Sequence, residues 1–212
     1  MKSKIFLETL KASGVKEIYL SGSASPKPAK DEWSELKKEV LQCIRCPELV
    51  RNRNKIVFGS GNPKAKLVFV GEAPGAEEDR QGLPFVGRAG QLLTKMIEAI
   101  QLKREDVFIA NVLKCRPPNN RPPQPQEIQN CEPYLVRQLE LIHPKVICAL
   151  GTFAAQTLLK TMQTISSLRG RVHNYKGIDL ICTFHPAYLL RNPAEKKRAW
   201  EDLKKVRELV NA

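Results

Sequence analysis

The residues best suited to chemistry in this sequence are a few polar groups that end short apolar runs. They lie in four segments: GEAPG (71–75), Asn111, 151–152 and 184–186. The segments contain the carboxylate of Glu72, the carboxamide of Asn111, which both donates and accepts, and the imidazole of His185. Gathered in one pocket, such groups can bind a polar ligand, orient water and stabilise a developing charge.

Four of the six cysteines form a second chemical feature. Cys43 and Cys46 make a CxxC pair, whereas Cys115 and Cys131 flank the basic, proline-rich segment 116–126. Two thiolates from one turn can hold one metal centre, so two such pairs suit either zinc or a 4Fe-4S cluster. The number of ligands leaves both open.

Cys148 and Cys182 differ from these four because both lie inside apolar runs. A free cysteine packs like a small apolar residue, so we expect these two in the core. Disulfides are not expected for any of the six in a reducing compartment.

Short apolar runs and helical patterns alternate along most of the chain. The runs 66–70, 107–112, 145–150 and 178–183 predict buried strands, and helices are expected near 31–43, 89–102, 124–141, 152–159 and 194–210. This alternation predicts an α/β fold, with a mostly parallel central sheet of about four strands and helices on both faces. Ligands bind at the carboxyl edge of such a sheet, where we expect the polar segments to converge.

The first 30 residues are expected to lie outside the main domain. Residues 1–20 have the pattern of a short amphipathic helix followed by an extended piece, and 21–30 are rich in Ser, Pro and Lys like a linker. We therefore expect an N-terminal extension and linker over 1–30 and one domain over 31–212, with Asp31 as the N-cap of its first helix.

The chain is strongly basic, with 35 Lys and Arg against 22 Asp and Glu and a formal charge of +13. Nucleic acid is the partner that such a charge favours, although a basic protein without a polyanionic ligand is the alternative. No run of 18 apolar residues is present, and charged residues such as Glu8 and Lys11 interrupt any signal peptide. We expect no membrane association and a cytoplasmic location, with the DNA.

Three motifs and the cysteine pairs resemble the family 4 uracil-DNA glycosylases. The motifs are GEAPGAEEDRQGLPFVGRAGQLL (71–93), ANVLKCRPPNNRPP (110–123) and FHPAYLLRNP (184–193). The resemblance extends from about residue 31 to the C-terminus. It implies the α/β glycosylase fold and a monofunctional enzyme that flips uracil out of single- or double-stranded DNA and hydrolyses its N-glycosidic bond. It also implies one 4Fe-4S cluster, held by Cys43, Cys46, Cys115 and Cys131.

The resemblance also assigns residues to the binding of the base. Phe85 is expected to stack on uracil, and Asn111 to read its N3–H and O4, where cytosine presents the opposite pattern. Glu78 is expected beside uracil C5, where it would exclude the methyl group of thymine. Gly71 and Gly75 belong to the same substrate-binding motif.

Catalysis is expected from Glu72 and His185. His185 matches a donor to uracil O2, and Glu72 is the candidate to orient water or face the cationic sugar. Because Ala73 stands where family 1 enzymes have an aspartate base, we expect a dissociative route that relies on electrostatics.

DNA contacts are expected from two further groups of residues. Leu190 and Arg191 are expected to enter the base stack from a loop over 188–191. Phosphate contacts are expected from basic residues: Lys114, Arg116, Arg121, Arg169 and Arg171.

Two other functions remain open from the residues alone. One is a non-catalytic DNA-binding or redox module, although such a protein needs no pocket of polar groups at strand ends. The other is a zinc-stapled hydrolase acting on nucleotides. For the glycosylase we expect a monomer, and a sliding clamp or another replication protein is a candidate partner for the N-terminal segment.

Overall fold

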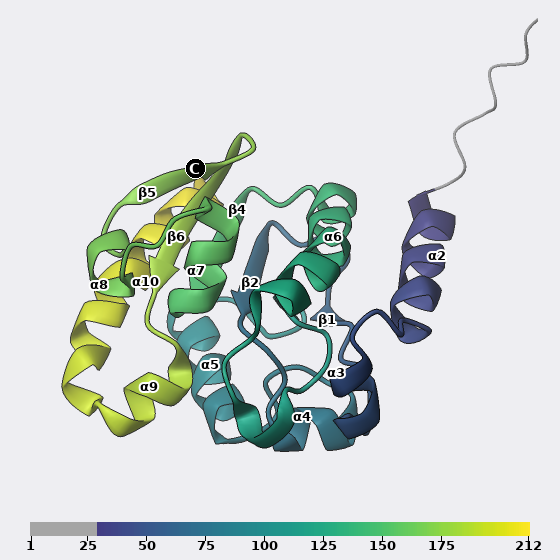
Figure 1. Cartoon of the computed structure of the whole chain (residues 1–212). Coiled ribbons are helices and arrows are strands. Elements are labelled where there is room, and N and C mark those ends of the chain that lie inside the picture. The colour runs from purple at the N-terminus through teal and green to yellow at the C-terminus, as the bar shows by residue number, and fades with distance from the viewer. Residues whose placement is uncertain (1–28) are drawn as a thin grey trace, which may run out of the picture.

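The computed structural model of the protein describes residues 29–212 (Figure 1), so the expectations for residues 1–28 lie outside the described part. The helices are α2 Ala29–Leu41, α3 Pro47–Asn52, α4 Ala76–Gln81, α5 Arg88–Ala99, α6 Pro125–Ile142, α7 Thr152–Leu159, α8 Ile165–Leu168, α9 Pro186–Arg191 and α10 Lys196–Asn211. The strands are β1 Ser60–Gly61, β2 Leu67–Gly71, β3 Phe108–Asn111, β4 Val146–Leu150, β5 Val172–Tyr175 and β6 Ile178–Thr183. Two 3-10 turns, η1 Pro118–Asn120 and η2 Pro193–Glu195, complete the list.

A single sheet in the order β1-β3-β2-β4-β6-β5 forms the centre of the fold. The four inner strands are parallel, as the apolar runs predict, whereas β1 and β5 are antiparallel edge strands. The expected number of about four strands is therefore too low. A run of apolar residues reveals strands buried on both faces, but β1 has only two residues and β5 (VHNY) is largely exposed.

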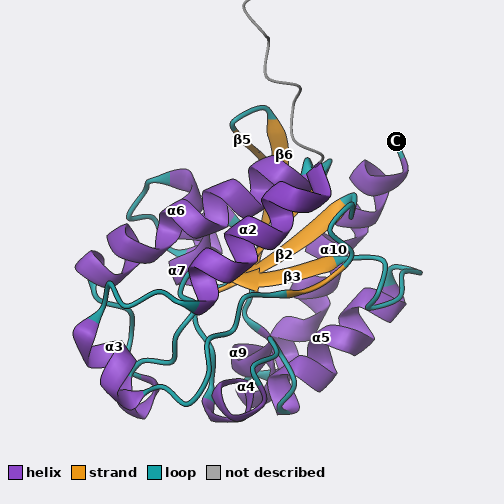
Figure 2. Cartoon of the chain, turned by 90° about the vertical axis from the view of Figure 1, so that its right-hand side faces the viewer, coloured by secondary structure: helices purple, strands orange, loops and turns teal. Residues whose placement is uncertain are grey.

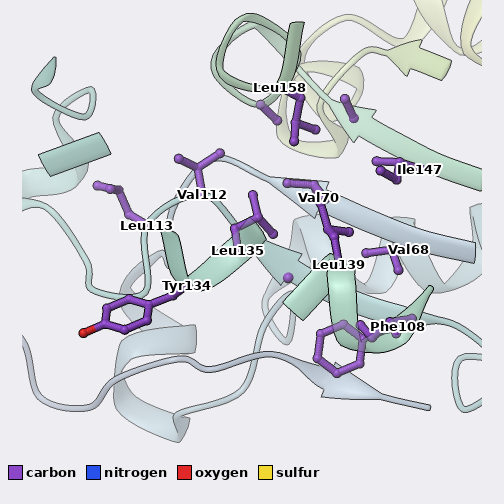
Figure 3. Close-up of a cluster of buried hydrophobic side chains, with 14 of the residues drawn as sticks. Val68, Val70, Phe108, Val112, Leu113, Tyr134, Leu135, Leu139, Ile147 and Leu158 are labelled. Carbon is purple, nitrogen blue, oxygen red and sulfur yellow. The ribbon is translucent and has the colours of Figure 1, made fainter. Parts of the chain in front are cut away.

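Helices cover both faces of the sheet (Figure 2). Alternate residues of the inner strands pack in two separate core clusters, one on each face. On one side Val68 and Val70 of β2 pack in the core cluster drawn in Figure 3, which α2, α6 and α7 complete. On the other side Leu67 and Phe69 pack against α5 and α10. This double cover explains why the inner strands read as continuous apolar runs.

The strand order reverses between β2 and β4. The chain moves from β2 to β3 in one direction and from β4 to β6 in the other, so the loops after these strands diverge and leave a crevice at their carboxyl ends. Gly71 and Asn111, the last residues of β2 and β3, lie opposite each other in the register. The fold therefore places the GEAPG and Asn111 segments side by side.

Some helices differ from the expected pattern. Asp31 lies within α2 and is not its N-cap, and residues 188–191 belong to α9 and not to a loop. Short helices such as α3, α4 and α8 span only four to six residues, too few for the apolar period to be recognised. Within residues 29–212, no helix combines the length and the apolar character needed to cross a membrane.

Candidate active site and thiol site

A cavity of about 430 Å³ opens at the carboxyl edge of the sheet. It brings together the ends of β2, β3 and β6 with α4, the loop before α5 and the loop that contains η1. The lining residues are Glu72, Ala73, Pro74, Gly75, Glu78, Phe85, Ala89, Asn111, Pro117, Asn120, Arg121, His185, Ala187, Tyr188 and Arg191. Most of the residues expected at the site thus share one cavity, whereas Gly71 lies behind it and Leu190 is not part of its wall.

Asn111 presents an unsatisfied polar group to the cavity. Its side chain is 2% exposed, and among the described residues Oδ1 is the only fully buried side-chain nitrogen or oxygen without a hydrogen-bond partner. A buried acceptor without a partner is unfavourable by about 1–3 kcal/mol, so a ligand that donates a hydrogen bond here is favoured.

Gly71 allows Asn111 and Phe85 to meet. A Cβ on Gly71 would lie 2.3 Å from Asn111 Oδ1 and 2.6 Å from Phe85 Cζ, so only glycine leaves room for both side chains. The Phe85 ring is also 5.5 Å from the His185 ring, with an interplanar angle of 33°. The aromatic ring, the amide and the imidazole therefore form adjacent parts of one wall.

Glu78 lines the cavity and also supports the loop that contains Phe85. Its Oε1 accepts hydrogen bonds from the backbone N–H of Val86 at 3.0 Å and of Gly87 at 3.1 Å. A Cβ on Gly75 would lie 2.7 Å from Oε2 of the same carboxylate, so Gly75 provides the space for it. Glu78 thus has a structural role that the sequence did not suggest.

His185 is the N-cap of α9. Its Nδ1 accepts a hydrogen bond from the backbone N–H of Ala187 at 3.1 Å, which leaves the proton of the neutral ring on Nε2. Burial, with a contribution from the positive charge of Arg191, lowers the pKa of His185 to about 4. The ring is therefore neutral at physiological pH and offers one N–H donor.

Glu72 follows β2 directly and lies half-buried in the cavity wall. Burial raises the pKa of its carboxyl group above the ordinary value, because desolvation disfavours the charged form. The ionised group is thus less solvated than a surface carboxylate and responds more strongly to a nearby positive charge.

The residues of α9 divide between core and surface. Leu189 is 1% exposed and packs in the core, and Leu190 is half-buried. Tyr188 and Arg191 are exposed and line the cavity, and Tyr188 stacks on Phe184 with 5.1 Å between ring centroids. Of the two residues expected to enter the DNA stack, only Arg191 lies at the cavity.

Lys114 is wrong as an expected phosphate contact, and Arg169 is already engaged in an ion pair. Lys114 is 1% exposed, and its Nζ donates to Asn111 O at 2.8 Å and to Gln138 Oε1 at 2.6 Å. Arg169 forms an ion pair with Asp202, which is 0% exposed, at 2.9 Å. Both side chains therefore make their polar contacts with other groups of the protein.

The other three basic residues are closer to solvent. Arg121 pairs with Glu127 at 2.6 Å and with Glu48 at 3.0 Å, yet it also lines the cavity. Arg116 is half-buried and Arg171 is exposed. Their contacts with phosphate remain predictions.

Cys43, Cys46, Cys115 and Cys131 line one small cavity between α2, α3 and α6. Three groups donate hydrogen bonds to the sulfurs: Arg53 Nη1 to Cys115 at 3.1 Å, the backbone N–H of Lys114 to Cys131 at 3.2 Å and Asn130 Nδ2 to Cys46 at 3.5 Å. Such donors favour thiolates over thiols. The two cysteine pairs, far apart in sequence, thus form one site.

Four thiols around one cavity suit either candidate centre, because both zinc and a 4Fe-4S cluster can be held by four cysteines. Within residues 29–212, no three His, Cys, Asp or Glu side chains already form a site for one metal ion.

Burial raises the pKa of Cys131 to about 12 and also raises the pKa values of Cys46 and Cys115. A bound centre would have to displace these protons, and it would then link its own binding to folding. Cys148 and Cys182 are 0% exposed in β4 and β6 and belong to the core, as expected.

Several residues that shape the site were missed by sequence reasoning. Pro117 and Asn120 come from the loop between Cys115 and Cys131 and form one wall of the active-site cavity. Asp79 of α4 is 0% exposed and accepts a hydrogen bond from the backbone N–H of Asn54 at 2.9 Å.

Comparison with known proteins gives one consistent family. Residues 58–204 match the model of the uracil DNA glycosylase superfamily. The chain is 48% identical to a type-4 uracil-DNA glycosylase of Archaeoglobus fulgidus, over 84% of this chain and 94% of the relative. It is 45% identical to the type-4 uracil-DNA glycosylase of Thermotoga maritima, over 85% and 96% of the two chains. A type-5 uracil-DNA glycosylase of Pyrobaculum aerophilum is less similar, at 30% identity over 74% and 83%.

Proposed function

Since the chain belongs to the uracil-DNA glycosylase superfamily, and within it to the type-4 enzymes, we propose that its cavity accepts a uracil everted from DNA and releases it as the free base. The observation that carries this proposal is the meeting of Glu72, Phe85, Asn111 and His185 in one cavity. A duplex hides the glycosidic bond, so the nucleotide must leave the stack at a cost of a few kcal/mol. The contacts that the base makes in the cavity must offset that cost.

Phe85 and Asn111 supply the recognition. Stacking of a base on an aromatic face contributes about 1–3 kcal/mol. Asn111 Oδ1, buried and without a partner, is placed to accept from uracil N3–H, while its amide N–H donates to O4. Cytosine presents an acceptor at N3 and a donor at N4, so both contacts would be lost.

His185 and Glu72 supply the electrostatics of bond breaking. The bond between uracil N1 and the sugar C1′ breaks with its electron pair leaving on uracil, and the sugar becomes positively charged. The N–H of His185 Nε2 would stabilise the charge at uracil O2, as a donor already held in place. The carboxylate of Glu72 would stabilise the sugar cation and orient the water whose hydroxyl adds to C1′, the proton passing to solvent or to the departing base.

We propose that Cys43, Cys46, Cys115 and Cys131 hold one 4Fe-4S cluster. When bound, the cluster supplies iron–thiolate bonds that join the segment after α2 to α6 and to the loop before it. That loop contributes Pro117, Asn120 and Arg121 to the active-site cavity, so its tethering shapes the wall.

The DNA backbone is proposed to lie across the mouth of the cavity. Arg191 and Tyr188 are exposed there, and the net charge of +13 favours a polyanion. Leu190 is proposed as the wedge that enters the base stack; it is half-buried and does not line the cavity. We propose that the protein acts as a monomer.

The test is an assay of strand cleavage on a single-stranded oligonucleotide with one uracil. The protein is expected to create an abasic site, so that the strand breaks after alkali and not before. An iron-containing protein that binds the oligonucleotide yet produces no alkali-labile site would favour a non-catalytic DNA-binding module. A colourless, zinc-loaded and active protein would overturn the proposed cluster.

A further inference from the structure

Phe85 has a backbone conformation that is uncommon for a residue with a side chain. Its φ of +52° lies in the left-handed region, yet the ring is 6% exposed and packed over Gly71. Residues keep such unfavourable conformations only where the surrounding structure imposes them, and they concentrate at functional sites. Neighbouring residues must therefore hold the peptide of Phe85.

Arg104, from the loop between α5 and β3, makes the most direct contacts with this peptide. Its Nη2 donates to the carbonyl oxygens of Pro84 at 2.7 Å and of Phe85 at 3.0 Å, and its Nη1 donates to Thr94 Oγ1 at 3.1 Å. The rigid fork of the guanidinium suits several acceptors at once, which a lysine could not match. Arg104 does not line the cavity, so its contact with the site passes through Phe85.

The first turn of α5 supports the same peptide from another side. A Cβ on Gly90 would lie 1.8 Å from the carbonyl oxygen of Phe85. Only glycine lets the helix approach this closely. Glu78 holds the next two amides, so the loop of Phe85 is fixed at its carbonyl groups and at its N–H groups.

We propose that Arg104 is a positioning residue for uracil recognition, which acts on the substrate only by holding Phe85 in its left-handed conformation. This inference rests on the proposed function, in which Phe85 stacks on the everted base. Arg104 lies outside both the cavity and the motif at 71–93. The proposal therefore gives a loop residue a contribution to base affinity that the motif does not explain.

A double-mutant cycle separates this role from a general structural one. Arg104→Met, Phe85→Ala and the double variant are compared by kcat/KM for uracil release from a single-stranded oligonucleotide and by inhibition with free uracil. Phe85→Ala is expected to lower kcat/KM by about 5- to 150-fold, the value of one stacked base. Arg104→Met should lower kcat/KM by no more than that. In the Phe85→Ala background its further effect should be below about twofold.

Two more variants keep the test independent of folding. Lys103→Met removes the same charge from the adjacent exposed residue and should leave kcat/KM unchanged. Thr94→Val removes one of the three partners of Arg104 but keeps its charge, so a smaller loss is expected, again abolished by Phe85→Ala. If Arg104→Met does not fold, Thr94→Val decides alone.

The outcomes distinguish the two proposals. Equal losses from Arg104→Met, or from Thr94→Val, with and without Phe85 would overturn the positioning role and leave the proposed function intact. A wild-type protein that releases no uracil would defeat the proposed function itself. Free uracil should inhibit the Arg104→Met protein more weakly than the wild type, whereas it should inhibit Lys103→Met as strongly as the wild type. This result would support the inference.

Discussion

His185 Nδ1 accepts a hydrogen bond from the backbone N–H of Ala187 at 3.1 Å. This contact, within one turn of α9, fixes which ring nitrogen carries the proton. Because the pKa of His185 is lowered to about 4, the ring is a neutral donor at physiological pH and not an imidazolium. The cavity therefore holds a prepared N–H donor, as the proposed stabilisation of negative charge on the departing uracil requires.

Replacing His185 with alanine should remove this donor. The expected loss is about 10²- to 10³-fold in kcat, the usual effect of losing one such group, with a small change in KM. Single-turnover release of uracil measures it. A loss confined to KM would assign His185 to binding instead of to the transition state.

Glu72→Gln should lower activity and raise stability at neutral pH. The folded-state pKa of Glu72 is raised, so the ionised carboxylate is better solvated in the unfolded chain than in the native protein. The amide removes that penalty, and the advantage should shrink as the pH falls through the raised pKa. Thermal unfolding at pH 7 and at pH 4 measures it; an equal or lower midpoint for the variant at pH 7 would contradict this account of Glu72.

Asn111→Asp should weaken uracil removal and permit some attack on cytosine. A carboxylate cannot donate to uracil O4, whereas it can accept from the N4 amino group of cytosine. Paired oligonucleotides with uracil or cytosine at one position measure the change in preference. Unchanged removal of uracil would take Asn111 out of the site.

Glu78→Ala should both relax the rejection of thymine and lower uracil removal. The first effect follows from the space left beside the base, and the second from loss of the hydrogen bonds to Val86 and Gly87. Glu78→Gln keeps an acceptor and should retain most activity on uracil. Full uracil activity in the alanine variant would show that the loop does not need this support.

Cys115→Ser should reduce the iron and sulfide content of the purified protein. Cys182→Ala, which changes a thiol in the core far from the four, is the matched control and should keep both. Iron and acid-labile sulfide per chain, with the visible absorption band, measure the difference. Equal iron in both variants would remove Cys115 from the ligand set.

The sequence predicted the inner sheet because strands buried on both faces must be apolar throughout. It could not show β5, whose exposed VHNY residues carry no such pattern, or the short helix α9. Lys114 shows why the environment of a single side chain is harder to predict from sequence than a strand. It stands in a basic loop beside Cys115, yet tertiary contacts with Gln138 bury it, and no local pattern reveals a partner 24 residues away.

The residues that line the candidate site were easier to predict than the residues that hold its loops in place. Residues that end parallel strands must meet at one edge, so Glu72, Asn111 and His185 could be expected together. Arg104 and Asp79 act through side-chain contacts with backbone groups of other loops, which spacing along the chain does not encode.

The most direct measurement is the identity of the base released from three single-stranded oligonucleotides that differ only in one uracil, cytosine or thymine. A cavity that reads an everted uracil through Asn111 and Phe85 predicts free uracil from the first strand and no base from the other two. Comparable release from all three strands, or no uracil from a protein that retains its iron and binds the strands, would contradict the account.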